Sequence, residues 1–319
     1  LGVGLVMNLT LRNYILPSSR LLVSANVAEN PELAIAYNRK IGTSQHWSDE
    51  LYTSLGRYKL TYYDDYGVRL GSYKRRFLEL GYGINYSLGL NHQLGAKGFF
   101  RNNTHIPQPD LYSIFPEAQF KKHTANDLGF SLFYKVNTTD NFYFPKKGMK
   151  SHLEFTHTAI TNSQLDISGF ASQPNYLLDE LYQPYATLYF KYNWFFTFAK
   201  RFTYNFGLDA GFNTNDPGVN GMFVLGGEQL RQSLIYKNLA GYYFAQLYAY
   251  NYTFAKSALN IETVKGLYLS GTVNVGNIGN RAEDLFNAFS DKRIPEYLWG
   301  YSVGLKYDSM LGPIQLLFI

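Results

Sequence analysis

The segment ATLYFKYNWFFTF at residues 186–198 decides the fold class of this chain. Every second side chain from Ala186 to Phe198 is apolar or aromatic, and the positions between them carry threonine, tyrosine, lysine, asparagine and phenylalanine. Successive side chains of a β-strand point to opposite faces, so a strand produces this period of two. The segment therefore predicts one long strand, with an apolar environment on one face and an environment of mixed polarity on the other.

The same alternation recurs along the whole chain, in segments of roughly 10 to 14 residues. Strands of soluble proteins usually have about 5 to 6 residues, whereas a strand tilted across a membrane needs about 9 to 11. We predict roughly 14 strands, at residues 2–14, 19–29, 31–41, 51–64, 73–89, 93–103, 125–137, 149–160, 184–199, 202–213, 241–254, 264–276, 297–309 and 313–319.

The composition excludes several classes of protein. The chain has 319 residues, of which 46% are hydrophobic and 18% aromatic, so intrinsic disorder is excluded. It contains no cysteine, which excludes disulfides and thiolate metal sites. No stretch approaches the ~18 apolar residues of a transmembrane helix. The net charge of +5 comes from 29 basic and 24 acidic residues that are scattered, so we expect no nucleic-acid partner.

The alternating pattern fits a membrane barrel better than a soluble sandwich. In a barrel the apolar face of each strand meets lipid and the polar face lines the lumen. Strand length, the aromatic excess and the number of strands favour an all-β, antiparallel transmembrane β-barrel. Strand edges cannot stay open in lipid, and bacterial barrels usually have even strand counts. We therefore expect one domain over residues 1–319, trimmed at both ends, from a barrel of about 16 strands in the bacterial outer membrane.

The predicted connections alternate between short and long. The long ones lie at residues 104–124, 161–183, 214–240 and 277–296. Short periplasmic turns that alternate with long extracellular loops are typical of outer-membrane barrels.

Two motifs resemble catalytic or metal sites but do not fit them. Gly300-Tyr301-Ser302-Val303-Gly304 matches a nucleophile elbow, which needs a strand, a sharp turn and then a helix; here one alternating strand runs through the motif. The triad His152, Glu154 and His157 cannot converge on a metal, because the period of two places His157 on the other face. We therefore predict no catalytic residue, no metal ligand, no cofactor and no enzymatic activity for this chain.

Three local patterns, in order along the chain, carry a resemblance to a known family. The first is DNFYFPKKG at residues 140–148, a turn before a strand, with characteristic residues Asp140, Asn141, Phe144, Pro145 and Gly148. The second is FVLGGEQLR at residues 223–231, in a long loop that precedes a strand beginning at Gly241. The third is LKYDSMLGPIQL at residues 305–316, a hairpin with characteristic residues Tyr307, Asp308, Gly312 and Pro313.

These patterns resemble the Omp85 superfamily of outer-membrane barrels. The second pattern is similar to the entry of the family's sixth extracellular loop. We expect this loop to fold back into the lumen, with Glu228 or Arg231 pairing with lumen-facing charges. Its candidate residues are Gly226, Gly227, Glu228 and Arg231.

Within the superfamily the chain most resembles the barrel domain of patatin-like proteins, the type Vd autotransporters of Gram-negative bacteria. The segments NLTLRN at residues 8–13 and ENPEL at residues 29–33 resemble their first strands. Assembly factors usually carry an Arg-Gly loop tip, whereas Arg231 is followed by Gln232. The resemblance implies a lipase domain upstream of the barrel and outside this chain.

The resemblance implies a barrel that translocates, inserts or anchors a polypeptide, as the transport half of a patatin-like phospholipase in type V secretion. Two alternatives stay open: an assembly factor for outer-membrane proteins, similar to BamA or TamA, and a passive porin-type channel. The expected partners are outer-membrane lipids and lipopolysaccharide, a polypeptide passenger or client, and partner subunits.

Overall fold

The computed structural model describes residues 5–27, 30–63, 68–114, 120–167, 175–177, 183–227, 236–281, 285, 297–309 and 312–318. Within these ranges the chain is all-β except for two short helices, α1 (Pro109–Ile114) and α2 (Gly218–Gly221), and the helical residue Leu285. None of the helices in the described ranges is long and apolar enough to cross a membrane.

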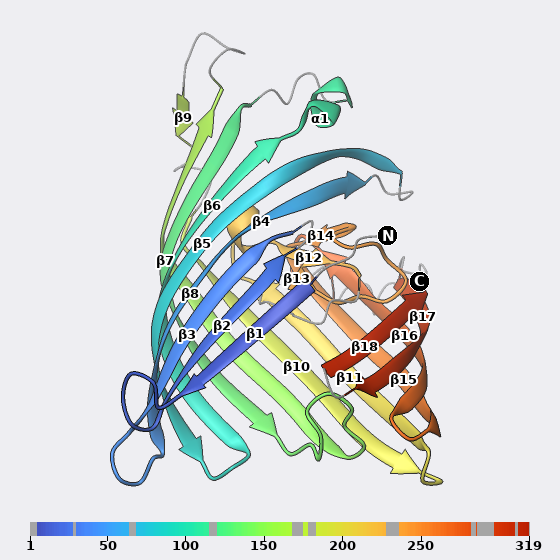
Figure 1. The fold of residues 1–319 in the computed structure, drawn as a ribbon. Coiled ribbons are helices and arrows are strands. Elements are labelled where there is room, and N and C mark those ends of the chain that lie inside the picture. The colour runs from blue at the N-terminus through green and yellow to red at the C-terminus, as the bar shows by residue number, and fades with distance from the viewer. Residues whose placement is uncertain are drawn as a thin grey trace. The chain divides into compact units, whose positions relative to one another are not determined.

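Fourteen strands follow one another in one sheet. Figure 1 labels the strands along the chain. Neighbouring strands pair antiparallel, as β4 does with β5 and β10 with β11. The strands in sheet order are β1 (Leu5–Arg12), β2 (Ser19–Val27), β3 (Glu32–Ile41), β4 (Trp47–Tyr63), β5 (Arg69–Leu88), β6 (His92–Pro107), β7 (Lys122–Asn137), β8 (Gly148–Asp166), β10 (Tyr185–Phe198), β11 (Phe202–Asn213), β15 (Asn251–Val264), β16 (Leu267–Gly279), β17 (Leu298–Ser309) and β18 (Gly312–Phe318). The predicted all-β, antiparallel fold is confirmed.

Four more strands lie outside this path. The short strand β9 (Asn175–Leu177) pairs with β8. A separate three-stranded sheet has the order β13 (Tyr236–Lys237), β12 (Phe223–Leu225) and β14 (Leu247–Ala249).

The contacts divide the chain into two compact units. The first unit contains Leu1–Phe133, Phe155–Ala186 and Asn215–Asn220, and the second contains Tyr134–Glu154, Thr187–Thr214 and Gly221–Ile319. Strands β7 and β8 contribute residues to both units. The assignment of residues 1–319 to a single domain stays a prediction.

The two faces of the sheet have opposite chemistry. On β7, Leu128, Phe130 and Leu132 are exposed, while Asp127 and Ser131 are buried on the other side. A soluble protein would bury the apolar set and expose the polar set. We call the face with exposed apolar side chains the outer face and the opposite one the inner face. The predicted split between an oily and a polar environment is confirmed.

The predicted strand at residues 241–254 is wrong, and the one at residues 264–276 is confirmed with its bounds shifted to Leu267–Gly279. The hairpin lies further along the chain, as β15 and β16, and turns at Lys265 and Gly266. Gly266 has a φ of +80°, which glycine adopts without strain. Alternation continues on both sides of this turn, so the period of two could not locate it. Gly241 does not begin a strand, because residues 241–246 lie between the short strands β13 and β14.

The long connections are also shifted from their predicted bounds. Strands β6, β8 and β16 continue to Pro107, Asp166 and Gly279, past the predicted starts of three loops. The remaining long loop, predicted at residues 214–240, extends to residue 250, and β15 begins at the next residue. The four long connections all join strands at the same end of the sheet.

A charge on the outer face should destabilise the protein strongly. Leu128, near the middle of β7, is 48% exposed on this face, and an arginine near the membrane midplane of a barrel costs about 2–4 kcal/mol. We expect Leu128→Arg to lower the free energy of unfolding by that amount in denaturant titrations in lipid vesicles. Leu128→Met is the matched control and should cost less than about 1.5 kcal/mol. Equal stability of the two variants would contradict the assignment of this face to lipid.

Candidate functional site

The connection between β11 and β15 folds back on itself as the three-stranded sheet. We call residues 221–227 and 236–250 the inner loop; all of them belong to the second unit. Strand β12 pairs with β13 in parallel, through Leu225 and Lys237, and with β14 antiparallel, through Phe223 and Ala249. The loop is therefore an ordered element with its own backbone hydrogen bonds (Figure 1).

The glycine pair that the sequence singles out is required by the backbone of this loop. Gly226 and Gly227 have φ angles of +123° and +71°, which side chains with a Cβ rarely adopt. A Cβ on Gly226 would lie 2.1 Å from the carbonyl oxygen of Tyr243. The amide of Gly227 donates to the carbonyl of Tyr242 at 2.9 Å, and its carbonyl accepts from the amide of Leu239 at 3.0 Å. The pair thus joins the two halves of the loop.

Apolar side chains attach the loop to the sheet. Phe223, Leu225 and Leu239 are buried together with Tyr252 and Phe254 of β15. The rings of Phe223 and Tyr252 meet edge to face, with 4.8 Å between their centroids. Burying one such side chain contributes about 1.5–3 kcal/mol, so these residues supply much of the attachment.

Missing side chains on the sheet make room for the loop. A Cβ on Gly211 of β11 would lie 2.5 Å from the ring of Phe223, and one on Gly300 of β17 would lie 2.1 Å from the carbonyl oxygen of Ala240. The hydroxyl of Tyr242 also donates to the carbonyl of Trp299 at 3.2 Å. Gly300 therefore belongs to a contact surface on the inner face. The predicted absence of a nucleophile elbow agrees with the continuous strand β17 through this motif.

A lysine of the loop is buried among charges of the inner face. Lys237 is only 3% exposed, and its Nζ lies 3.3 Å from the centroid of the Tyr189 ring, a cation–π contact. Asp209 and Glu154 act on it as nearby negative charges, and Lys191 acts as a nearby positive charge. These four residues around Lys237 belong to the sheet: Tyr189 and Lys191 lie on β10, Asp209 on β11 and Glu154 on β8.

The acidic residues of this cluster have further partners. The hydroxyl of Tyr252 donates to Asp209 Oδ1 at 2.5 Å, and Lys191 Nζ lies 3.6 Å from Asp209 Oδ2. The other acid, Glu154, is 2% exposed and its Oε2 lies 3.0 Å from His152 Nε2. Buried charges persist when they are paired, so the cluster combines two acids with two lysines.

The position of Lys237 strongly affects its protonation. Burial lowers the pKa of Lys237 to about 7, against the raising effect of Asp209 and Glu154, and Lys191 lowers it further. The loop therefore carries a group that titrates near neutral pH. The arrangement can act as a reversible attachment of the loop, because its strength depends on one proton.

The first family pattern forms a turn at the other end of the strands. Asp140 Oδ1 accepts from the amides of Lys146 and Lys147 at 2.9 and 3.2 Å. Asn141 Oδ1 accepts from the amides of Tyr143 and Phe144 at 2.9 and 3.0 Å. Each side chain thus holds part of the turn in place.

The same turn packs on the hairpin of β15 and β16. The ring of Phe144, the residue before Pro145, stacks on Tyr268, with 5.1 Å between centroids. Lys146 Nζ lies 2.6 Å from Glu262 Oε2. Gly148 begins β8 with a φ of +98°, and a Cβ there would lie 2.3 Å from the carbonyl of Thr138. We assign this motif a role in shaping the turn.

The last pattern lies in the hairpin of β17 and β18. Asp308 is opposite Pro313 in the register, Tyr307 is opposite Ile314, and Gly312 begins β18. The amide of Asp308 donates to the carbonyl of Gly266 at 2.8 Å. The structure thus places this hairpin beside the β15–β16 turn, at the opposite strand end from the inner loop.

The remaining predicted site residues, Glu228 and Arg231, lie outside the described residues. The loop charge that the structure brings to the inner face is Lys237, which the sequence analysis missed. The signal was present on the strands, where Glu154, Lys191 and Asp209 are charged residues at inner-face positions. Across the described ranges, no group of three or more histidines and acids could hold a metal ion.

Attachment of the inner loop should strengthen as the pH rises above 7. Docking lowers the pKa of Lys237 from 10.5 to about 7, so undocking takes up a proton between these values. The docked-to-undocked ratio should then rise by up to about tenfold per pH unit in this window. The measurement is hydrogen-exchange protection of residues 236–250, corrected for the intrinsic rate. Lys237→Met has no proton to gain and should show no such slope; equal slopes would contradict the assignment.

Several solved structures have a fold similar to that of this chain. They include BamA from Haemophilus ducreyi lacking POTRA domains 1–3, with a TM-score of 0.65 and 12% identity over 99% of this chain. CdiB from Acinetobacter baumannii has a TM-score of 0.56 and 10% identity over 96% of this chain. CdiB from Escherichia coli has a TM-score of 0.55 and 13% identity over 99% of this chain. This chain covers 65%, 51% and 56% of those three chains, so it spans about half to two thirds of their length.

The sequence comparisons give the family. No curated protein matches the sequence. The family model of the OMP85 superfamily matches residues 115–319, well over half of the chain. The chain therefore belongs to the OMP85 superfamily and is a β-barrel protein of the bacterial outer membrane.

Proposed function

We propose that this chain is the membrane-spanning part of a protein that translocates, inserts or anchors a polypeptide at the outer membrane. The observation that carries the proposal is the inner loop, a folded element seated on the inner face of its unit. Gly211 and Gly300 leave the space that its backbone and Phe223 occupy. A passive porin needs an inner face that contacts water, whereas this one is shaped to receive a folded segment.

The attachment of this loop is suited to release. Burial lowers the pKa of Lys237 to about 7, so a proton taken up by this side chain weakens the attachment. The apolar part of the attachment is a small cluster around Phe223 and Tyr252. An element held by such contacts can be displaced by a passing polypeptide that offers similar apolar groups.

In the finer form of the proposal, the polypeptide is a patatin-like phospholipase domain that belongs to the same protein and precedes this chain. This form rests on the resemblance of residues 8–13 and 29–33 to patatin-like proteins and on the absence of an Arg-Gly tip after Gly227. The chain itself then has no catalytic role and serves type V secretion. Its other proposed partners are outer-membrane lipids, lipopolysaccharide and partner subunits.

A second candidate function is assembly of other outer-membrane proteins. The likeness of fold to BamA, over 99% of this chain, favours it. The two candidates differ in the polypeptide that meets the inner face: a segment of the same protein in the first and foreign barrel proteins in the second.

A photoreactive side chain on the inner face should capture that polypeptide. On β1, Thr10 is exposed on the inner face and its neighbour Leu9 is 53% exposed on the outer face. In cells that produce the full-length protein, we expect a photoreactive amino acid at Thr10 to give polypeptide adducts, which mass spectrometry identifies. The same amino acid at Leu9 is the matched control and should give none, because that face meets lipid.

The adducts decide between the candidates. A segment of the same protein with a lipase sequence supports the patatin-like form, and foreign outer-membrane proteins support the assembly factor. The absence of adducts at Thr10, together with a large and steady single-channel conductance, would contradict both and support a porin-type channel.

A further inference from the structure

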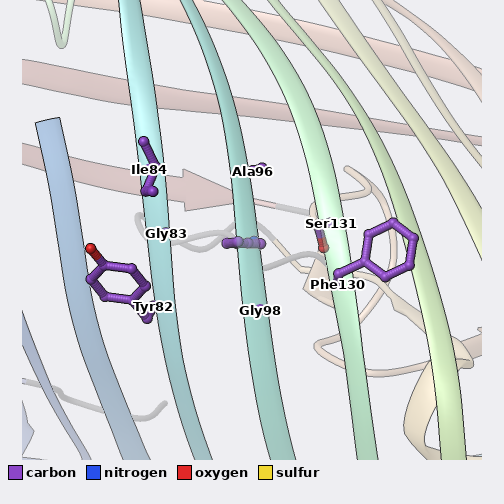
Figure 2. A pocket seen from close by; sticks show the side chains of 8 residues that line it. Tyr82, Gly83, Ile84, Ala96, Gly98, Phe130 and Ser131 are labelled. Atoms are coloured by element: carbon purple, nitrogen blue, oxygen red, sulfur yellow. The ribbon is translucent and has the colours of Figure 1, made fainter. Parts of the chain in front are cut away.

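The outer face of the first unit has a hollow between β5 and β7. Its volume is about 250 Å³, and it is lined by Tyr82 and Ile84 of β5, Ala96 and Gly98 of β6, and Phe130 of β7. Figure 2 shows the rings of Tyr82 and Phe130 on either side of the small residues of β6. Pockets for compact ligands have about 300 to 1,000 Å³, so this hollow fits only a narrow apolar group.

The hollow exists because β6 lacks large side chains at two successive outer-face positions. Leu94 and Phe100 are exposed on the outer face of β6, and Ala96 and Gly98 lie between them. A Cβ on Gly98 would have no neighbour closer than the carbonyl oxygen of Gly129 at 4.0 Å. Among the residues that the structure describes, no packing contact requires a glycine there, in contrast to Gly211 and Gly300.

A charged pair lies beside this hollow on the same face. Arg39 of β3 donates to Asp49 of β4 through Nε and Nη2, at 3.3 and 2.8 Å. Asp49 is opposite Ile84 in the register, and Ile84 is opposite Ala96. Arg39 is also close enough to Tyr82 to interact with it electrostatically. The pair thus sits at the end of the hollow nearest the β3–β4 turn.

Aromatic residues mark the depth of this pair in the membrane. Trp47, two residues before Asp49, is exposed on the outer face, and its ring lies 4.8 Å from that of Tyr86. Tryptophan and tyrosine gather at the membrane–water interface, and charges deeper in the hydrocarbon are costly. The charged pair is therefore at headgroup depth, while the hollow extends from it toward the acyl chains.

We propose that this surface binds one zwitterionic phospholipid, a phosphatidylethanolamine. The guanidinium of Arg39 matches a phosphate, the carboxylate of Asp49 accepts from the ethanolamine ammonium, and one acyl chain fills the hollow. The opposite charges of the pair select a headgroup that carries both signs. An anionic phospholipid or the phosphates of lipopolysaccharide would offer Arg39 a phosphate as well, but would bring no ammonium to Asp49. The site depends on the membrane fold and not on the proposed transport function.

The test measures the lipids that the full-length protein retains. The protein is transferred to nanodiscs of equal parts phosphatidylethanolamine and phosphatidylglycerol, and retained lipids are counted by native mass spectrometry. Gly98→Leu fills the hollow, and we expect about tenfold weaker retention of phosphatidylethanolamine, the loss for about two uncovered methylene groups. Gly271→Leu is the matched control, because Gly271 faces outward on β16 and a Cβ there would meet no described atom within 4 Å. This variant should retain as much phosphatidylethanolamine as the unsubstituted protein.

A second variant tests the headgroup and needs no change in the hollow. Asp49→Asn leaves Arg39 without its negative partner, so the preference should shift from phosphatidylethanolamine to phosphatidylglycerol. Heat-modifiable migration in detergent gels shows that each variant is folded. The proposal is overturned if the unsubstituted protein retains the two lipids equally. It is also overturned if Gly98→Leu retains as much phosphatidylethanolamine as Gly271→Leu, or if Asp49→Asn keeps the original preference.

Discussion

The need to satisfy two different environments with one sheet determines the rest of this structure. Polar groups without partners are costly in a lipid environment, so the outer face carries apolar side chains such as Leu128 and Phe130, and polar side chains lie mostly on the inner face. The inner face thereby gathers acids and lysines that need partners. The inner loop places Lys237 among them, and apolar contacts around Phe223 hold the loop on the sheet.

Glycines have two different uses on these faces. On the inner face, Gly211 and Gly300 let the loop approach the backbone closely, and side chains there would collide with it. On the outer face, Gly98 has open space around it, so its place is consistent with a lipid contact. The same residue type thus serves a fixed internal contact in one unit and an external hollow in the other.

The period of two predicted the antiparallel sheet and both of its faces, because alternation is a local property of each strand. It placed the β15–β16 hairpin wrongly, because only the positive φ of Gly266 distinguishes that turn from the alternating residues around it. The burial of Lys237 near the charges of Glu154 and Asp209 could not be predicted, because those residues come close only when separate strands and a loop are brought together. The glycine pair was found because its backbone requirement is local.

The central claim is that the inner loop is seated on the inner face. Since the chain has no cysteine, single cysteines can report on it in isolated outer membranes. Leu239 is 2% exposed and Tyr243, in the same loop, is 61% exposed. The account predicts that Tyr243→Cys reacts quickly with a hydrophilic maleimide, that Leu239→Cys is protected, and that adding Gly300→Val removes this protection. Equally fast labelling of Leu239→Cys and Tyr243→Cys without the Gly300 change would contradict it.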